Sequence, residues 1–290
     1  METKGRNMLN RLVAWRELLV RRARRWWRIR PRCIGLVLSG GAVRGIAHIG
    51  VLEVLEEAGI PIHCVVGVSA GSAVGAAYCA GLTPARLREV AADLRWTRIS
   101  RVQRPKLGLL DMSPLEDYFN ELLGARLTFA DLRIPFAAVA ADVVNSELVV
   151  LREGPVATAV RASCAVPAIF SPVRLNGRLL VDGGLINNLP VSVARNLGAD
   201  YVIAVDLLPR GALGREPRNL LEMLAASFYA RMLITHSEAS QADCLITPDV
   251  THVGLTDFSN APALLEAGRV AAHMALPKLR RDLRISSESV

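Results

Sequence analysis

Apolar residues along this chain follow two alternating patterns, which predict strands and helices in turn. Short runs of β-branched and other apolar residues at 33–39, 63–66 and 201–208 are typical of strands buried on both faces of a sheet. The segment 46–58 instead places its isoleucine and leucines on one helical face and its glutamates on another. Strands that alternate with helices indicate an α/β fold with a largely parallel sheet.

Turn and helix-cap signals divide the remaining sequence. Asn176-Gly177 lies between two strand-like segments and predicts a tight hairpin, and Asn145-Ser146 predicts a second turn. Thr83 and Ser113, each followed by proline, are predicted to cap the amino ends of helices. The segment 209–290 is predicted to be mostly helical.

Length and composition predict one folded body with appendages. A chain of 290 residues with 51% hydrophobic residues can bury a large core. We expect the body at 33–208, a C-terminal helical segment at 209–290 and an extension at 1–32. The five cysteines are scattered and form no C-x-x-C pair, which argues against a disulfide framework and against a zinc site. Reduced thiols in a cytoplasmic location are therefore expected.

The net charge of +8 belongs to the N-terminal extension and not to the body. Residues 1–32 hold eleven basic and two acidic residues, so the extension carries +9 and the other 258 residues carry −1. Within it, Met8, Leu12, Trp15 and Leu19 recur at steps of three or four among arginines, which predicts an amphipathic helix. The arginines exclude a signal peptide and a membrane-spanning helix.

A basic amphipathic helix of this kind is typical of an anchor at an anionic lipid surface. The sequence therefore predicts that residues 1–32 bind the inner membrane surface from the cytoplasmic side. Two alternatives stay open, a disordered basic arm and, less favoured, a segment that contacts nucleic acid. The oligomeric state is not predicted.

The sequence Gly-Val-Ser-Ala-Gly places Ser69 between a predicted strand and a small-residue helix. In a strand–turn–helix elbow the central side chain is exposed above the sheet, and the flanking Gly67 and Gly71 avoid collisions with neighbouring elements. A serine at this point can act as a nucleophile, and the helix amino end behind it favours negative charge. The alternative is a tight turn with an inert serine.

The glycine-rich loop "SGGAVRG" (39–45) joins the first strand to its helix, where backbone N–H groups can converge on an anion. The alternative is a dinucleotide-binding loop, which requires an acidic residue at the end of the second strand. That strand ends in Gly67-Val68-Ser69 without a carboxylate, so an oxyanion-binding loop is favoured.

A nucleophilic serine also needs a base. No histidine lies in a late strand-end loop, where an α/β-hydrolase triad would place it, and His48 is interpreted as a packing residue. Asp182 ends an apolar strand in "LLVDGGLINNLPV" and is followed by two glycines. Partial desolvation there would raise the pKa of this carboxyl group and make it a better base toward a serine hydroxyl. The alternative is an ordinary Asp-Gly turn.

Together, "LSGGAVRGIAHIGVL", "GVSAGS" and "VDGGLINNLPV" resemble the patatin-like phospholipase family, especially its short bacterial members. The resemblance runs from about Cys33 to Leu207. It implies a three-layer α/β fold and a lipid acyl hydrolase that uses a Ser–Asp dyad without a metal or organic cofactor. Ser69 would be the nucleophile and Asp182 its base. The oxyanion hole would be formed by the amides around three loop residues with an arginine beside them, namely Gly40, Gly41, Ala42 and Arg44.

In one respect the loop departs from the family pattern, because Ala42 stands where the family usually has glycine. If the backbone φ there is positive, alanine strains the loop and lowers turnover. The implied substrate is a membrane lipid or another fatty-acyl ester. Two alternatives remain, a non-lipid carboxylesterase or thioesterase and a non-catalytic membrane-associated adaptor. A basic cluster, Arg95, Arg98, Arg101, Arg104 and Lys106, is interpreted either as the rim of the site or as a solvated loop.

Overall fold

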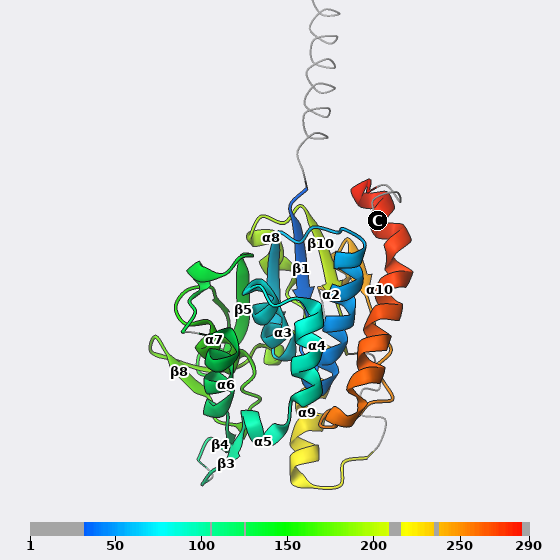
Figure 1. Cartoon of the computed structure of the whole chain (residues 1–290). Coiled ribbons are helices and arrows are strands. Elements are labelled where there is room, and N and C mark those ends of the chain that lie inside the picture. The colour runs from blue at the N-terminus through cyan, green and yellow to red at the C-terminus, as the bar shows by residue number, and fades with distance from the viewer. Residues whose placement is uncertain (1–31, 105, 125, 209–215, 235–237, 286–290) are drawn as a thin grey trace, which may run out of the picture. The chain divides into compact units, whose positions relative to one another are not determined.

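A mixed β-sheet forms the middle layer of the fold, and the predicted buried strands make up its centre (Figure 1). The computed structural model describes residues 32–104, 106–124, 126–208, 216–234 and 238–285. Within these residues the strand order is β11-β10-β1-β2-β5-β9-β8, with β6 paired to β5. The parallel strands are β1 (Ile34–Leu38), β2 (Cys64–Val68), β5 (Phe136–Asp142), β10 (Tyr201–Val205) and β11 (Cys244–Ile246). The antiparallel strands are β6 (Glu147–Leu151), β8 (Val173–Leu175) and β9 (Arg178–Asp182).

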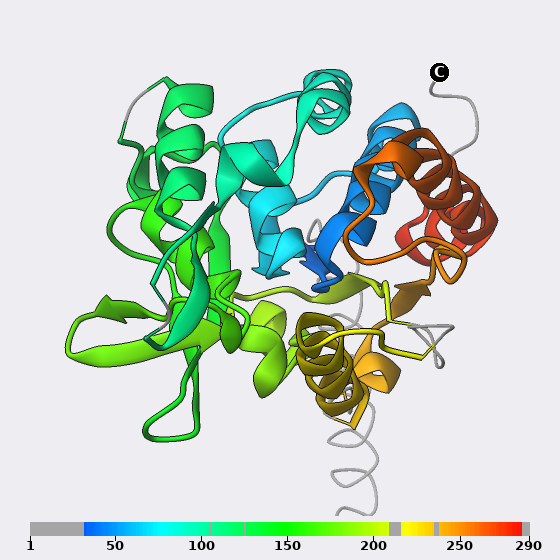
Figure 2. The same cartoon turned by 90° about the horizontal axis from the view of Figure 1, so that it is seen from below.

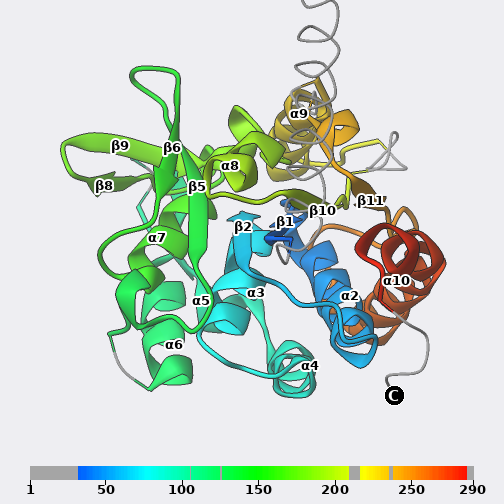
Figure 3. The same ribbon diagram turned by 90° about the horizontal axis from the view of Figure 1, so that it is seen from above.

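Helices cover both faces of this sheet, which gives three layers (Figure 3). One face carries α2 (Ala47–Glu57), α3 (Ala70–Cys79), α4 (Pro84–Asp93), α6 (Ser113–Leu123), α7 (Val156–Ser163) and α10 (Ala261–Leu283). The other carries α8 (Val191–Asn196) and α9 (Leu220–Ile234). Two hydrophobic cores lie on the opposite faces of the sheet, and successive residues of β1 point to them in turn. Leu36 and Leu38 face the larger core, and Val37 faces the smaller core. The predicted α/β fold with a largely parallel sheet is confirmed.

The local turn signals are mostly confirmed. Asn176 and Gly177 join β8 to β9 with φ values of 49° and 76°, as a two-residue hairpin turn with positive φ at both positions requires. Thr83 caps α4 by accepting a hydrogen bond from the Arg86 N–H. The predicted cap at Ser113 is wrong, because Ser113 is the first residue of α6 and donates its own N–H to Asp111.

The C-terminal segment contributes two long helices, as predicted, and also a strand. β11 extends the parallel sheet beside β10, and α10 packs on α2. A β-carbon on Gly50 would lie 2.0 Å from the Leu265 carbonyl oxygen, and one on Gly268 would lie 2.0 Å from the Ala47 carbonyl oxygen. These glycines therefore permit the close contact between the helices. The described residues from Cys33 onward form one compact unit, in which the C-terminal segment completes the sheet.

A small second sheet lies at the carboxyl end of the central strands. It consists of β3 (Arg101–Val102), β4 (Gly108–Asp111) and β7 (Ala168–Phe170), and it follows the short helix α5 (Trp96–Ile99). The sequence patterns did not predict these elements. One-turn 3-10 helices complete the list, η1 (Ala42–Ile46), η2 (Phe129–Asp131), η3 (Gly183–Leu185), η4 (Ala239–Gln241) and η5 (Phe258–Asn260).

The amphipathic helix predicted in residues 1–32 lies, except for Arg32, outside the described residues, so its role at a membrane surface stays a prediction. In the part of the chain that the structure describes, no helix has both the length and the apolar composition needed to cross a bilayer. All five cysteines are free thiols, and four of them are buried.

Candidate active site

Ser69 lies in the sharp turn between β2 and α3. Its backbone has φ 51° and ψ −124°, a conformation that non-glycine residues rarely adopt and that marks strained functional turns. A β-carbon on Gly67 would lie 2.5 Å from the Gly71 carbonyl oxygen, and one on Gly71 would lie 2.2 Å from the Leu38 carbonyl oxygen. Both glycines of the motif are therefore required by the close packing of helix and strands around Ser69.

Two further serines hold the strained turn in place. The Ser163 hydroxyl accepts the Ser69 backbone N–H at 2.9 Å and donates to the Val139 carbonyl at 2.6 Å. The Ser72 hydroxyl donates to the Ser69 carbonyl at 2.7 Å. All three side chains are buried. Sequence reasoning missed Ser163, because it lies in an ordinary helix without a motif and reaches Ser69 only in the folded protein.

The sheet topology brings Asp182 to Ser69. β2 and β9 share one edge of β5, where Val68 pairs with Val139 and Asp182 pairs with Ala140. β2 runs parallel to β5 and β9 runs antiparallel to it, so their carboxyl ends meet at adjacent positions on that edge. The residue that follows β2 and the residue that ends β9 are therefore neighbours, although more than a hundred positions separate them in the sequence.

The Asp182 carboxyl group is fully buried, and this burial controls its protonation. Its Oδ1 accepts the Gly184 N–H at 2.9 Å. Burial raises the pKa of Asp182 to about 7, although the nearby Ser69 hydroxyl and the Gly184 N–H act in the opposite direction. Within the described residues, Oδ2 has no partner that meets hydrogen-bond distance and angle. Because hydrogen bonds in unliganded active sites are often long, this oxygen remains suited to receive the Ser69 proton.

The glycine-rich loop lies directly beside Ser69. A β-carbon on Gly40 would lie 3.0 Å from the β-carbon of Ser69. The Gly40 N–H donates to Asn188 Oδ1 at 3.1 Å, and the Arg44 N–H donates to the Gly41 carbonyl at 3.1 Å. Among the described residues, the N–H groups of Gly41 and Ala42 have no hydrogen-bond acceptor. Of the four residues expected at the oxyanion hole, these two have backbone donors that are free to bind an anion.

The Arg44 side chain donates hydrogen bonds to backbone carbonyls of the C-terminal segment. It is 1% exposed, and its guanidinium donates from Nε to the Val253 carbonyl at 2.9 Å and from Nη2 to the Thr251 carbonyl at 3.4 Å. Burial lowers the pKa of this guanidinium. These contacts tie the glycine-rich loop to the C-terminal segment.

His48 is a buried packing residue, as interpreted from the sequence. Its Nε2 donates to the Ser39 carbonyl at 2.8 Å, and burial lowers its pKa to about 4. The Ser39 hydroxyl in turn accepts the Leu207 N–H at 3.0 Å. His48 therefore supports the start of the glycine-rich loop in its neutral form.

Sequence reasoning missed two further groups around the site, besides Ser163. Asn188, inside the third motif, binds both sides of Gly40, since its Oδ1 accepts the N–H at 3.1 Å and its Nδ2 donates to the carbonyl at 3.5 Å. Helix α9 covers the site, and the Met232 methyl group lies 2.6 Å from the β-carbon position of Gly184 and 3.3 Å from that of Gly40. Asn188 belongs to the third motif and could have been found there. Nothing in the sequence of α9 indicates that this helix lies over the site.

An apolar cavity of about 160 Å³ extends from Ser69 between α3, α4 and α6. One face of α3 lines it with small side chains, namely Ala70, Ala73, Val74 and Ala77. Larger apolar residues complete the wall, among them Ile49, Leu87, Met112, Leu115, Phe119 and Phe170. The small-residue helix predicted from the sequence therefore leaves room for a ligand. The cavity therefore places an apolar site next to Ser69.

Comparison with known proteins identifies the family of this chain. The family model described as "Patatin-like phospholipase" matches residues 36–195. The chain belongs to the patatin-like phospholipase family.

An uncharacterized NTE family protein of Mycobacterium tuberculosis is 34% identical over 283 residues, which cover 86% of this chain and 47% of that protein. The mouse patatin-like phospholipase domain-containing protein 6 is 37% identical over 185 residues, which cover 60% of this chain and 13% of that protein. The chain thus spans about half the length, or less, of these relatives.

Solved structures with similar folds include VipD from Legionella pneumophila, with a TM-score of 0.57 and 16% identity over 86% of this chain and 67% of that one. ExoU from Pseudomonas aeruginosa, in complex with SpcU, has a TM-score of 0.53 and 16% identity over 86% of this chain and 53% of that one. At this identity the likeness concerns the fold.

Replacing Ala42 with glycine is expected to stabilise the protein. The φ of Ala42 is 50°, a region that costs a residue with a β-carbon about 1–2 kcal/mol and costs glycine little. The gain exceeds the extra chain entropy that glycine brings to the unfolded state, so urea denaturation should give an increase of about 0.5–1 kcal/mol. The matched control, Ala80→Gly, changes a residue with φ −71° and should lose stability. Destabilisation by Ala42→Gly would refute the strained backbone.

Proposed function

We propose that this protein is a lipid acyl ester hydrolase in which Ser69 is the nucleophile and Asp182 is its general base. Family membership supports hydrolysis of a lipid ester. The observation that carries the mechanism is the meeting of a strained, buried serine with a buried carboxyl group at one edge of β5. The apolar cavity beside Ser69 supports a fatty-acyl substrate.

In the first half-reaction, the Ser69 oxygen attacks the ester carbonyl carbon while the Asp182 carboxylate takes the hydroxyl proton. The proton then passes from Asp182 to the leaving alcohol as the bond between the carbonyl carbon and the alkoxy oxygen breaks. An acyl group remains on Ser69. In the second half-reaction, Asp182 takes a proton from water, and the resulting hydroxide displaces Ser69 from the acyl group. The proton returns to Ser69 and a carboxylic acid is released.

The oxyanion that forms during each attack requires preorganised donors. We assign this role to the N–H groups of Gly41 and Ala42, because the loop adjoins Ser69 and both groups lack a protein acceptor in the described residues. The contacts of Asn188 with Gly40 and of Arg44 with Val253 hold the loop in place. Asn188 and Arg44 are therefore positioning residues in this mechanism.

The cavity supports a lipid hydrolase over an esterase for short soluble substrates. Its walls are almost entirely apolar, so each methylene that enters it from water contributes about 0.8 kcal/mol, or about fourfold in binding. This gain raises kcat/KM if the acyl chain of the substrate is buried in the cavity in the transition state. The proposal therefore favours long acyl esters over acetyl esters.

A series of p-nitrophenyl esters tests the proposed substrate class. Ala77 lines the cavity two helical turns, about 12 Å of helix rise, from Ser69. Ala77→Leu is expected to leave kcat/KM for butyrate esters unchanged and to lower it at least tenfold for dodecanoate esters. Ala80→Leu, at the residue that caps the carboxyl end of this helix and outside the cavity lining, should change neither. Equal loss for both ester lengths would contradict an acyl chain in this cavity.

A further inference from the structure

The end of the molecule that carries the active site also presents exposed apolar side chains. The β3–β4 hairpin and α9 lie at the same end of the fold, opposite the amino end of β1 (Figure 1), and the view onto that end shows both (Figure 2). In the hairpin, Val102 is 84% exposed and Leu107 is 58% exposed. Soluble proteins rarely gather exposed large apolar side chains beside a binding site without an interaction that buries them.

Helix α9 is apolar on two opposite faces. Its inner face buries Phe228, Tyr229 and Met232 over the active site. Its outer face exposes Leu220 and Met223, which lie on adjacent turns, and Ile234 at its end. A helix that covers a site needs only one apolar face for packing. The outer face is therefore available for a second apolar environment.

The hairpin and α9 are connected through one strand next to Ser69. β4 pairs with β7, and α9 packs on β7 and on η3, the turn that follows Asp182. Phe170 of β7 lines the acyl cavity together with Ser69. The hairpin tip and the outer face of α9 thus flank the site. We call this surface the docking rim, defined by Val102, Arg104, Lys106, Leu107, Leu220, Met223 and Ile234.

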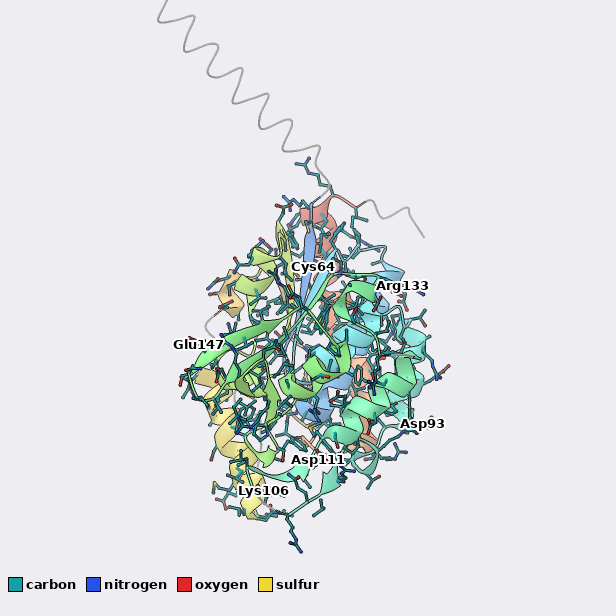
Figure 4. The ribbon with its side chains drawn as sticks, turned by 90° about the vertical axis from the view of Figure 1, so that its left-hand side faces the viewer. Cys64, Asp93, Lys106, Asp111, Arg133 and Glu147 are labelled. Atoms are coloured by element: carbon teal, nitrogen blue, oxygen red, sulfur yellow. The ribbon has the colours of Figure 1, made fainter. Side chains whose placement is uncertain are left out.

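The charges of the docking rim have one sign at the hairpin tip. Arg104 and Lys106 are exposed and form no ion pair within the described part of the chain, whereas Arg101 is bound to Asp111. Figure 4 shows Lys106 near the lower end of the molecule, away from Glu147. Cations beside exposed apolar side chains match an anionic lipid surface, where phosphates meet the acyl region.

We propose that the docking rim binds the surface of an anionic phospholipid membrane. Val102 and Leu107 enter the boundary between headgroups and acyl chains, Arg104 and Lys106 bind lipid phosphates, and the outer face of α9 lies on the same surface. The biological purpose of this docking rests on the proposed lipid hydrolase function, because the surface brings the acyl cavity to its substrate. Binding itself does not require hydrolysis, so the two proposals can fail separately.

Local fluorescence tests this surface in the full chain, independently of residues 1–32. The protein carries Ser69→Ala, so that vesicles stay intact, and Cys33→Ser, which removes the only partly exposed cysteine among the five. An environment-sensitive fluorophore is attached at Leu107→Cys or at Met223→Cys. With phosphatidylglycerol vesicles both probes should gain intensity and shift to the blue. A control probe at Arg152→Cys should not respond. Arg152 follows β6, whose last residue, Leu151, pairs with Ala138 near the amino end of β5.

The charges are tested with the same probes. Arg104→Gln/Lys106→Gln should require about thirtyfold more phosphatidylglycerol lipid for half-maximal response at low salt, since each basic residue near the surface contributes about 1 kcal/mol. The matched pair Arg126→Gln/Arg152→Gln should leave the titration unchanged. In protein that keeps the wild-type Ser69, neither pair of substitutions should change kcat/KM for a soluble butyrate ester.

Several results would overturn the membrane-docking proposal. One is a Leu107→Cys probe whose fluorescence does not change although the protein sediments with vesicles. Another is a control probe at Arg152→Cys that responds as strongly as the rim probes. A third is a rim-probe response to neutral phosphatidylcholine vesicles that equals the response to phosphatidylglycerol vesicles. Salt-sensitive binding of Arg104 and Lys106 to RNA or to an acidic protein, without a lipid response, would assign the surface to another partner. Lipid responses at both rim probes, together with no ester hydrolysis by protein that keeps Ser69, would uphold docking and refute the proposed function.

Discussion

Replacing Ser69 with alanine is expected to lower kcat/KM for carboxylic esters by about a thousandfold or more. The change removes the atom that would form the acyl-enzyme, and removal of a nucleophile typically leaves only the contribution of substrate binding and oxyanion donors. The fold should persist, because the hydrogen bonds that hold the turn use the Ser69 backbone and not its hydroxyl.

Ester hydrolysis by wild type and Ser69→Ala, with matching circular dichroism, measures this loss. Ser100→Ala removes another buried hydroxyl, which donates to the Trp96 carbonyl, and should retain most of the activity. Retention of more than about a tenth of wild-type kcat/KM by Ser69→Ala, a loss below about 1.4 kcal/mol, would refute the nucleophile assignment.

Asp182→Asn is expected to combine a loss of activity with a gain in stability. The amide cannot accept the Ser69 proton, so kcat/KM should fall by about a thousandfold or more. In the wild type, kcat/KM should decline as the pH falls through about 7, because burial raises the pKa of Asp182 to about 7 and the protonated form is no base. Steady-state kinetics from pH 5 to 9 measure both effects.

The stability gain has a defined pH window. Between about pH 4 and 7 the native state keeps the Asp182 proton while the unfolded state loses it, so wild-type stability falls by about 1.4 kcal/mol per pH unit. Asparagine does not titrate. The free energy of unfolding of Asp182→Asn relative to wild type should therefore rise by up to about 4 kcal/mol across this window and stay constant above it.

Asp142→Asn is the matched control for this prediction. Asp142 is also a buried carboxylate at a strand end, but hydrogen bonds from Asn145 and the backbone and the charge of Arg178 lower its pKa. Its carboxylate stabilises the fold above its unfolded pKa, so Asp142→Asn should lose stability as the pH rises, with activity retained. A pH-independent difference between Asp182→Asn and wild type in urea denaturation would contradict a buried, proton-binding Asp182.

The sequence predicted those parts of the molecule that depend on local pattern. Apolar runs gave the central strands, and the Asn176-Gly177 dipeptide gave the hairpin, because backbone conformation and burial on both faces are properties of short segments. The motifs around Ser69 and Asp182 also follow predicted strands, so the strand pattern alone predicted that each residue lies at the carboxyl end of a strand.

The rest depends on contacts between segments that are distant in the sequence. Ser163 reaches Ser69 from α7, α9 covers the site from beyond residue 209, and the Arg44 guanidinium is bound by the carbonyls of residues 251 and 253. The small strands β3, β4 and β7 are too short for a periodic pattern. The cavity forms where small residues of α3 face α4 and α6, and helix packing of this kind carries no motif.

Labelling with a long-chain alkyl fluorophosphonate tests the central assignment most directly, because this reagent modifies an activated serine covalently. Peptide mass spectrometry of the labelled full chain should find the phosphonyl group on Ser69, and labelling should slow as the pH falls through about 7. Ser69→Ala should take up no label, and Asp182→Asn should react far more slowly than wild type. Modification of another serine, or labelling of Ser69→Ala at the wild-type rate, would contradict the assignment.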